Sequence, residues 1–147
     1  MWVALLSLVG VFVAVYLYLY KIGKIGTMAC GTGGCETVQL SEWATFGGIE
    51  VSLIGALGYL ALLAVALVGL QPAFSASRSV TVLLVAMSGL GVVFAIYLTV
   101  LELFVIHAIC RWCVVSAGII ALVFVASLLD LRWGDSRVAG STSLSAS

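Results

Sequence analysis

Long apolar runs separated by shorter polar stretches dominate the chain. Each run is long enough to cross the hydrocarbon core of a bilayer as a helix, and the runs cover residues 2–20, 51–70, 79–105 and 110–131. The longest polar connection, residues 21–50, joins the first two runs, and a serine-rich tail, residues 134–147, follows the fourth. The pattern predicts an all-α integral membrane protein, a four-transmembrane-helix bundle over residues 1–133 with a disordered tail.

The composition agrees with this interpretation. Of the 147 residues, 64% are hydrophobic and 8% are charged, whereas soluble domains carry about 25% charged residues. The formal net charge is zero and there is no basic patch, so nucleic acid is not an expected partner. The first run lacks the features of a cleaved signal peptide, and its tyrosines before Lys21 are typical of a membrane interface, so we expect it to be retained.

Two of the four cysteines lie in the long connection, in Cys30-Gly-Thr-Gly-Gly-Cys35. The glycines between them predict a flexible tip. After Cys35, apolar residues recur at helical spacing, which predicts a short helix over residues 36–46 that lies on the membrane surface. This loop would cover the end of the bundle.

The other two cysteines form Cys110-Arg111-Trp112-Cys113, where the fourth run begins. Residues three apart on a helix share a face, near disulfide range. A helix N-terminus and the Arg111 charge both favour thiolate over thiol, and a thiolate is the species that attacks a disulfide. The placement favours a redox-active pair over a static bridge.

Four spans put the cysteine loop and the Cys110 turn on one side of the membrane and both termini on the other. The positive-inside count is tied, three basic residues to three. Working disulfides belong in an oxidising compartment. We therefore expect the cysteines outside the cytoplasm, both termini in the cytoplasm, and the protein in the cell inner (plasma) membrane.

Sequence alone leaves several alternatives open. Four thiols allow three disulfide connectivities, and a disulfide-stapled scaffold or a four-cysteine zinc site would use the same residues, although we expect no metal beside such a loop. His107 and Glu102 are candidates for moving protons, and Arg111 for tuning a thiolate or anchoring at the headgroups. A lone interfacial histidine more often meets only water or a carbonyl, and a carboxylate at the interface is less indicative than one at membrane depth.

Several segments in order resemble the bacterial homologues of vitamin K epoxide reductase, over most of the chain from Cys30 to Val115. They are Cys35-Glu-Thr-Val-Gln-Leu-Ser41, Trp43-Ala44, Phe46-Gly47-Gly48-Ile49, Leu53-Ile-Gly-Ala-Leu-Gly-Tyr59, Tyr97-Leu-Thr-Val-Leu-Glu-Leu-Phe104 and His107-Ala-Ile-Cys-Arg-Trp-Cys113-Val-Val. The chain departs from the family pattern at Glu50, where the family often has proline, and in the short spacing of the loop cysteines.

The resemblance implies a four-helix membrane enzyme that oxidises a thioredoxin-like partner and passes two electrons to a quinone of the menaquinone, ubiquinone or phylloquinone type. Cys30 and Cys35 would be the shuttle pair, and Cys110 and Cys113 the active-site pair. Cys113 would be nearest the quinone and Cys110 would exchange with Cys35. Ser41 matches a loop hydroxyl that the family places near the active site, which makes it a candidate for cofactor binding.

Many bacterial relatives carry a fused thioredoxin-like domain, and from the end of this sequence we expect the partner to be a separate extracytoplasmic protein. Reduction of vitamin K epoxide itself would use the same sites. Another type of four-helix, quinone-linked thiol oxidase carries its Cys-x-x-Cys in the first loop and its looser pair in the second, and this chain has the reverse order.

Overall fold

The structure is a computed structural model that describes residues 1–26, 34–73 and 77–145, with side chains as far as residue 134. Within these residues, four helices are long and apolar enough to cross a membrane. They are α1 (Trp2–Lys21), α3 (Val51–Leu70), α4 (Arg78–Leu101) and α5 (Arg111–Ser145). The all-α, four-span fold predicted from the hydropathy pattern is confirmed.

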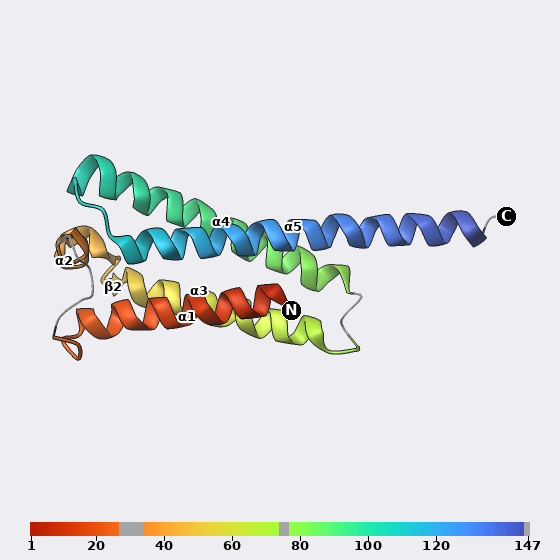
Figure 1. Ribbon diagram of the computed structural model, residues 1–147, viewed down its shortest axis with the longest axis horizontal. Coiled ribbons are helices and arrows are strands. Elements are labelled where there is room, and N and C mark those ends of the chain that lie inside the picture. Colours follow the sequence, from red (N-terminus) through yellow and green to blue (C-terminus); the bar gives the residue numbers. More distant parts are fainter. Residues whose placement is uncertain (27–33, 74–76, 146–147) are drawn as a thin grey trace.

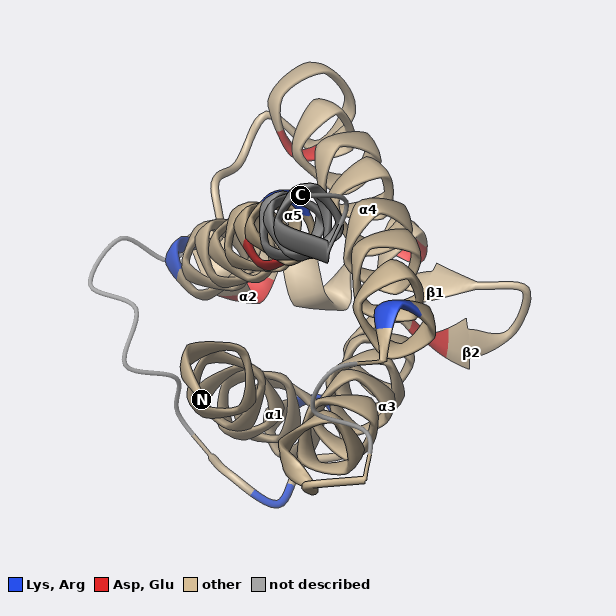
Figure 2. Cartoon of the chain, turned by 90° about the vertical axis from the view of Figure 1, so that its right-hand side faces the viewer, with Lys and Arg blue, Asp and Glu red and all other residues tan. Residues whose placement is uncertain are grey.

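The helices pack into a bundle in which α1 contacts α3 and α5, and α4 contacts α5 and α3. The loop helix α2 (Gly34–Leu40) lies at the same end of the bundle as the start of α5, and the N-terminus lies toward the other end (Figure 1). Viewed along the bundle, Lys, Arg, Asp and Glu take up only a few places on the ribbon (Figure 2), and residues 2–20, 51–70, 79–101 and 112–129 contain none of them. This is the distribution that a lipid-embedded bundle requires, because isolated charges are costly in hydrocarbon.

Small residues bring neighbouring helices close together. A Cβ atom at Gly10 of α1 would lie 2.4 Å from the ring of Tyr59 on α3, and one at Gly91 of α4 would lie 2.8 Å from Ile120 on α5. Close approach at small residues is the usual basis of helix association in lipid, where no hydrophobic force drives helices together. Gly10 also leaves room for Tyr59 to reach across the bundle.

The polar connection is more broken than the predicted single helix over residues 36–46. Helix α2 ends at Leu40, because the backbone turns to an extended conformation at Ser41, whose N–H and hydroxyl both donate to the carbonyl of Val38. A 3₁₀ turn, η1 (Glu42–Ala44), follows. Strands β1 (Thr45–Phe46) and β2 (Ile49–Glu50) then pair antiparallel around two glycines with positive φ.

The third span also differs from a single helix over residues 79–105. Helix α4 ends at Leu101 and continues as a π-helical turn, η2 (Glu102–Ile106). His107 ends that turn in the left-handed region, with φ 54°, a conformation that histidine adopts more readily than most residues. The N–H groups of His107 and Ala108 donate to the carbonyl of Glu102. The chain therefore reverses within a few residues before α5.

The two ends of α5 differ from the sequence expectation. The helix begins at Arg111, not at Cys110, and it runs on to Ser145, whereas the sequence predicts its end near Leu131 and a disordered tail over residues 134–147. No proline interrupts the segment after Leu131, and without one the backbone hydrogen bonds of a helix can continue through polar residues. The location of this segment in the cytoplasm stays a prediction.

We expect Gly10→Ala to destabilise the bundle, because the buried Tyr59 ring is held by a hydrogen bond and cannot move aside freely. Gly118→Ala is the matched control, since a Cβ there meets no atom within 4 Å. The free energy of unfolding in detergent should be lower for Gly10→Ala than for Gly118→Ala by about 1–3 kcal/mol. Equal values for the two variants would contradict this packing.

Candidate active site

Cys110 caps the N-terminus of α5 with its sulfur. Its carbonyl accepts the N–H of Val114, so it occupies the N-cap position, and its Sγ lies 3.3 Å from the N–H of Cys113, which donates to it. Side-chain acceptors at this position satisfy N–H groups that have no partner within the helix. The Cys110 side chain is fully buried, so the helix end is its main polar environment.

This position favours the Cys110 thiolate. Hydrogen bonds donated by the Cys113 thiol and by the backbone N–H groups of Cys113 and Trp112 hold the pKa of Cys110 below its usual range, although burial and the nearby Glu102 charge oppose them. Arg111, which the sequence suggested as a tuning charge, is exposed to the surroundings. The helix end and Cys113 therefore do more than Arg111 to favour the thiolate.

Glu102 lies in the same cluster, at the first position of the π-helical turn. Only 5% of its surface is exposed, and its Oε2 accepts the N–H of Cys110 at 3.2 Å. Its carboxyl also forms a hydrogen bond with the thiol of Cys113. Because α4 opens into a π-helix here, the carboxyl turns inward to the start of α5. π-Helical turns of this kind are frequent at functional sites.

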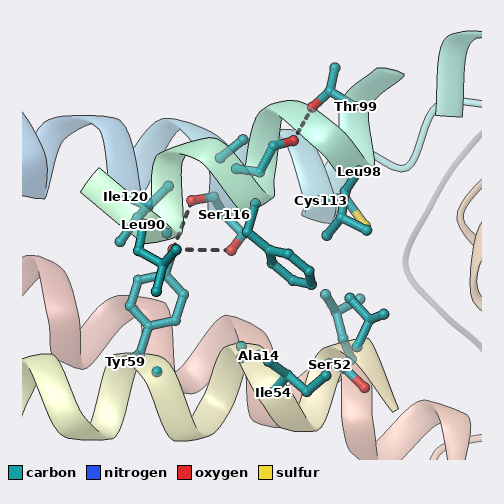
Figure 3. A pocket seen from close by; sticks show the side chains of 18 of the residues that line it. Ala14, Ser52, Ile54, Tyr59, Leu90, Leu98, Thr99, Cys113, Ser116 and Ile120 are labelled. Atoms are coloured by element: carbon teal, nitrogen blue, oxygen red, sulfur yellow. Dashed lines mark hydrogen bonds between the residues drawn. The ribbon is translucent and has the colours of Figure 1, made fainter. Parts of the chain in front are cut away.

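Cys113 lies at the wall of a cavity of about 450 Å³ inside the bundle. The cavity is lined mainly by apolar side chains of α3, α4 and α5, including Ile54, Leu62, Leu90, Phe94, Leu98 and Ile120. Figure 3 shows Cys113 and Ser116 of α5 on one side of this space and Tyr59, Ile54 and Ser52 of α3 on the other. An apolar cavity with few polar groups is typical of sites for small organic molecules.

A few polar groups interrupt this apolar wall. The Tyr59 hydroxyl donates to the carbonyl of Ser116 at 2.8 Å and lies 3.1 Å from its hydroxyl (Figure 3). The Gln39 amide lies 3.8 Å from Cys113 Sγ, to which it donates. The buried Ser52 hydroxyl has no hydrogen-bond partner among the described residues. A bound molecule with oxygen acceptors would satisfy that donor.

Helix α2 brings Cys35 to the active-site turn. Cys35 is fully buried and disulfide-bonded, whereas Cys110 and Cys113 are free thiols. At the start of α2, a Cβ on Gly34 would lie 2.5 Å from the carbonyl oxygen of Ile109, so only glycine permits this approach. Cys35 therefore follows a residue that touches the backbone next to Cys110.

Lys21 fixes this arrangement from the end of α1. Its Nζ donates to the backbone carbonyl of Gln39 and lies 3.6 Å from a carboxylate oxygen of Glu50. One ammonium group thus joins the ends of α1 and α2 to the start of α3. Glu50, where the resembling family often has proline, supplies the carboxylate of this ion pair.

The remaining residues singled out in the sequence lie elsewhere. Ser41 donates to Val38, and it is absent from the described residues that line the cavity, so a contact with a cofactor stays a prediction. His107 is exposed, with its ring against the carbonyl of Val105. Cys30 lies outside the described residues. Of the candidate pair for moving protons, only Glu102 reaches the cysteines.

Sequence reasoning missed Gln39, Ser52, Tyr59 and Ser116 as wall residues. Gln39 follows Cys35 by four positions and Ser116 follows Cys113 by three. Residues at these spacings share a helix face, so helical spacing from each cysteine was the available signal. Tyr59 and Ser52 lie on α3, far from any cysteine in sequence, and carried no such signal.

We expect the Cys110 thiol of the reduced protein to titrate below about 8.5, the ordinary value for cysteine. A lowered pKa means that the thiolate persists to lower pH. The ultraviolet thiolate absorption that is lost in Cys110→Ser should give this midpoint. In Cys113→Ala the thiol donor is gone, so the midpoint should rise toward the ordinary value. An unchanged midpoint would show that Cys113 does not stabilise the thiolate.

Comparison with protein-family models matches residues 1–128 to one family, described as the Vitamin K epoxide reductase family. The matched region contains all four cysteines and the residues that line the cavity. Its members are oxidoreductases that use quinones. With its four apolar helices, the chain is therefore a multi-pass membrane oxidoreductase that belongs to the vitamin K epoxide reductase family.

Proposed function

We propose that the protein generates disulfides by oxidising a thioredoxin-like partner and passing two electrons to a membrane quinone. Electrons would enter at Cys30 and Cys35, move to Cys110 and Cys113, and leave from Cys113. The observation that carries this proposal is the position of the reduced pair. Cys110 is sealed beneath the loop, whereas the Cys113 thiol lies at the wall of an apolar cavity inside the bundle.

The redox states of the cysteines correspond to one stage of this relay. Cys35 is disulfide-bonded while Cys110 and Cys113 are both free thiols. This combination would follow transfer of electrons from the loop pair to the active-site pair and precede transfer to a quinone. A purely structural role predicts stapled and inert cysteines, and the free pair with a favoured Cys110 thiolate argues against it.

The cavity fits a quinone ring. It offers an apolar space for the ring and, at its wall, donors for carbonyl oxygens in the Gln39 amide and the unpaired Ser52 hydroxyl. When bound, a quinone of the menaquinone, ubiquinone or phylloquinone type would supply the acceptor for two electrons and two protons. The protein's part would be to hold Cys113 at the cavity wall and to surround the ring with apolar side chains.

An oxidised Cys35 also supports the proposed orientation. Disulfides persist in oxidising compartments, so the cysteine end of the bundle would face away from the cytoplasm, with both termini in the cytoplasm and the bundle in the cell inner (plasma) membrane. The partner would then be an extracytoplasmic thioredoxin-like protein, which we propose to be separate from this chain.

We expect Cys110→Ser and Cys113→Ser each to abolish quinone reduction by any thiol donor, since these two sulfurs stand between every donor and the cavity. Cys35→Ser should abolish reduction by a protein dithiol yet retain part of the rate with a small dithiol, which needs only a brief movement of α2 away from the turn to reach the buried Cys110. Quinone absorbance in detergent measures both rates. Equal losses in all variants with both donors would contradict a relay.

The relay further requires Cys35 to reach Cys110. In the double variant Cys30→Ser, Cys113→Ser only these two thiols remain, so mild oxidation should join them within one chain. The double variant Cys30→Ser, Cys110→Ser is the matched control, in which Cys35 and Cys113 should cross-link more slowly. Non-reducing peptide mapping of the monomer distinguishes the two bridges. Free thiols in the first variant, with the fold retained, would rule out this exchange step.

A further inference from the structure

Glu102 is a buried carboxyl group at the end of a membrane span. Ionisable groups in such places are costly, and they usually mark proton or ion pathways. Among the described residues, no lysine, arginine or histidine forms an ion pair with Glu102. Its partners are instead the backbone N–H of Cys110 and the thiol of Cys113.

The thiol of Cys113 lies between two acceptors. It donates to the sulfur of Cys110, where it stabilises the thiolate, and it also lies within hydrogen-bonding reach of the Glu102 carboxyl. Glu102 is held in place by the N–H of Cys110, and its side chain lines the same cavity as Cys113. One carboxyl group thus touches both the thiol and the cavity.

Oxidation of the pair creates a proton to be moved. Two S–H bonds break and one S–S bond forms, so the cysteines lose two electrons and two protons, and the quinone gains both as it becomes a hydroquinone. Because Cys110 is favoured as the thiolate, its proton passes to water before this step, and the hydroquinone takes one proton from water in exchange. The second proton is on Cys113 Sγ, and once the Cys110 sulfur bonds to Cys113 it no longer accepts that proton.

We propose that Glu102 accepts the proton of the Cys113 thiol and delivers it to the cavity, where it joins the reduced quinone. This inference rests on the proposed function and adds a catalytic residue to it. The proton moves from Cys113 Sγ to the Glu102 carboxylate as the S–S bond forms, and then from the carboxyl to a quinone oxygen. The carboxylate is regenerated for the next cycle.

No other titratable group among the described residues is placed for this task. On the neighbouring elements, Arg111 and His107 are exposed, and Lys21 is engaged by Glu50 and by the carbonyl of Gln39. On α3, the Tyr59 hydroxyl donates to the carbonyl of Ser116. On α2, Cys35 is in a disulfide and Glu36 is exposed. Among the titratable groups of the described residues, Glu102 alone joins the reactive thiol to the cavity.

Glu102→Gln is the direct test, because its amide oxygen can still accept the N–H of Cys110 while the side chain can no longer carry the proton. General acid–base groups contribute about 10²–10⁴-fold, so kcat for quinone reduction should fall at least about 100-fold with little change in KM for the quinone. Glu42→Gln, an exposed carboxylate on the same side of the membrane, is the control and should stay within about 2-fold.

A second readout needs no quinone. In the Cys110→Ser background with the loop disulfide intact, alkylation of Cys113 by a small maleimide depends on removal of its proton. A carboxylate that accepts the proton speeds alkylation, so adding Glu102→Gln should slow alkylation of Cys113 at least about 10-fold at neutral pH. The rise of the alkylation rate with pH that reflects deprotonation of the Glu102 carboxyl should also disappear. A carboxylate that acts only as a negative charge disfavours the thiolate, so its loss would speed alkylation.

The outcomes separate cleanly. Suppose first that the parent protein reduces quinone. The inference is then overturned, while the proposed function stands, if Glu102→Gln reduces quinone at the parent rate. It is likewise overturned if adding Glu102→Gln to the Cys110→Ser background leaves the alkylation rate of Cys113 unchanged or raises it. If the parent protein reduces no quinone, the proposed function fails, and the alkylation rates still decide whether Glu102 takes the proton.

Should Glu102→Gln fail to fold, Glu102→Asp is the second variant. It retains an ionisable group, so its alkylation rate should still depend on pH in the range where the carboxyl group titrates, at a lower rate overall. Loss of this pH dependence in a folded Glu102→Asp variant would also overturn the inference that Glu102 accepts the proton.

Discussion

The hydrogen bond from the N–H of Cys110 to the Glu102 carboxyl joins the end of the third span to the start of the fourth. Inside a membrane protein every backbone group near the hydrocarbon needs an internal partner, and a chain that reverses between two spans leaves several N–H groups free. Glu102 satisfies one of them, and the Cys110 sulfur satisfies another at Cys113. The groups that close the fold at this point are therefore one of the reactive sulfurs and the carboxyl group that contacts both cysteines.

The sequence predicts the spans well because lipid imposes a simple rule. A helix must be about 20 apolar residues long to cross the core, and the second span, residues 51–70, matches α3 at both ends. The ends of other spans are harder to predict. The π-helical turn at Glu102 and the helix beyond Leu131 depend on hydrogen bonds and on polar residues that hydropathy does not distinguish from a loop.

The same reasoning explains what the sequence shows of the site. Cys110 and Cys113 were identified because their spacing carries chemistry by itself. Counting residues along the third span predicts that Glu102 lies near the membrane interface. The π-helical turn changes which way its side chain points, and the carboxyl is buried against α5. The role of Ser41 in cofactor binding stays a prediction, because a family position does not tell which backbone carbonyl its hydroxyl will meet.

Helix α2 carries both Cys35, at the start of the proposed electron path, and Gln39, which contacts Cys113 at its end. Cys35 and Gln39 are four residues apart, so they lie on one face of the same short helix, and both are buried against the active-site end of the bundle. Gln39 touches Cys113, while the residue before Cys35 touches the backbone before Cys110. If α2 moves as a unit, the displacement that frees Cys35 for a partner also withdraws the Gln39 amide from Cys113. Thiol exchange at the surface and the polarity of the cavity wall are then linked through one helix, which Lys21 holds in place.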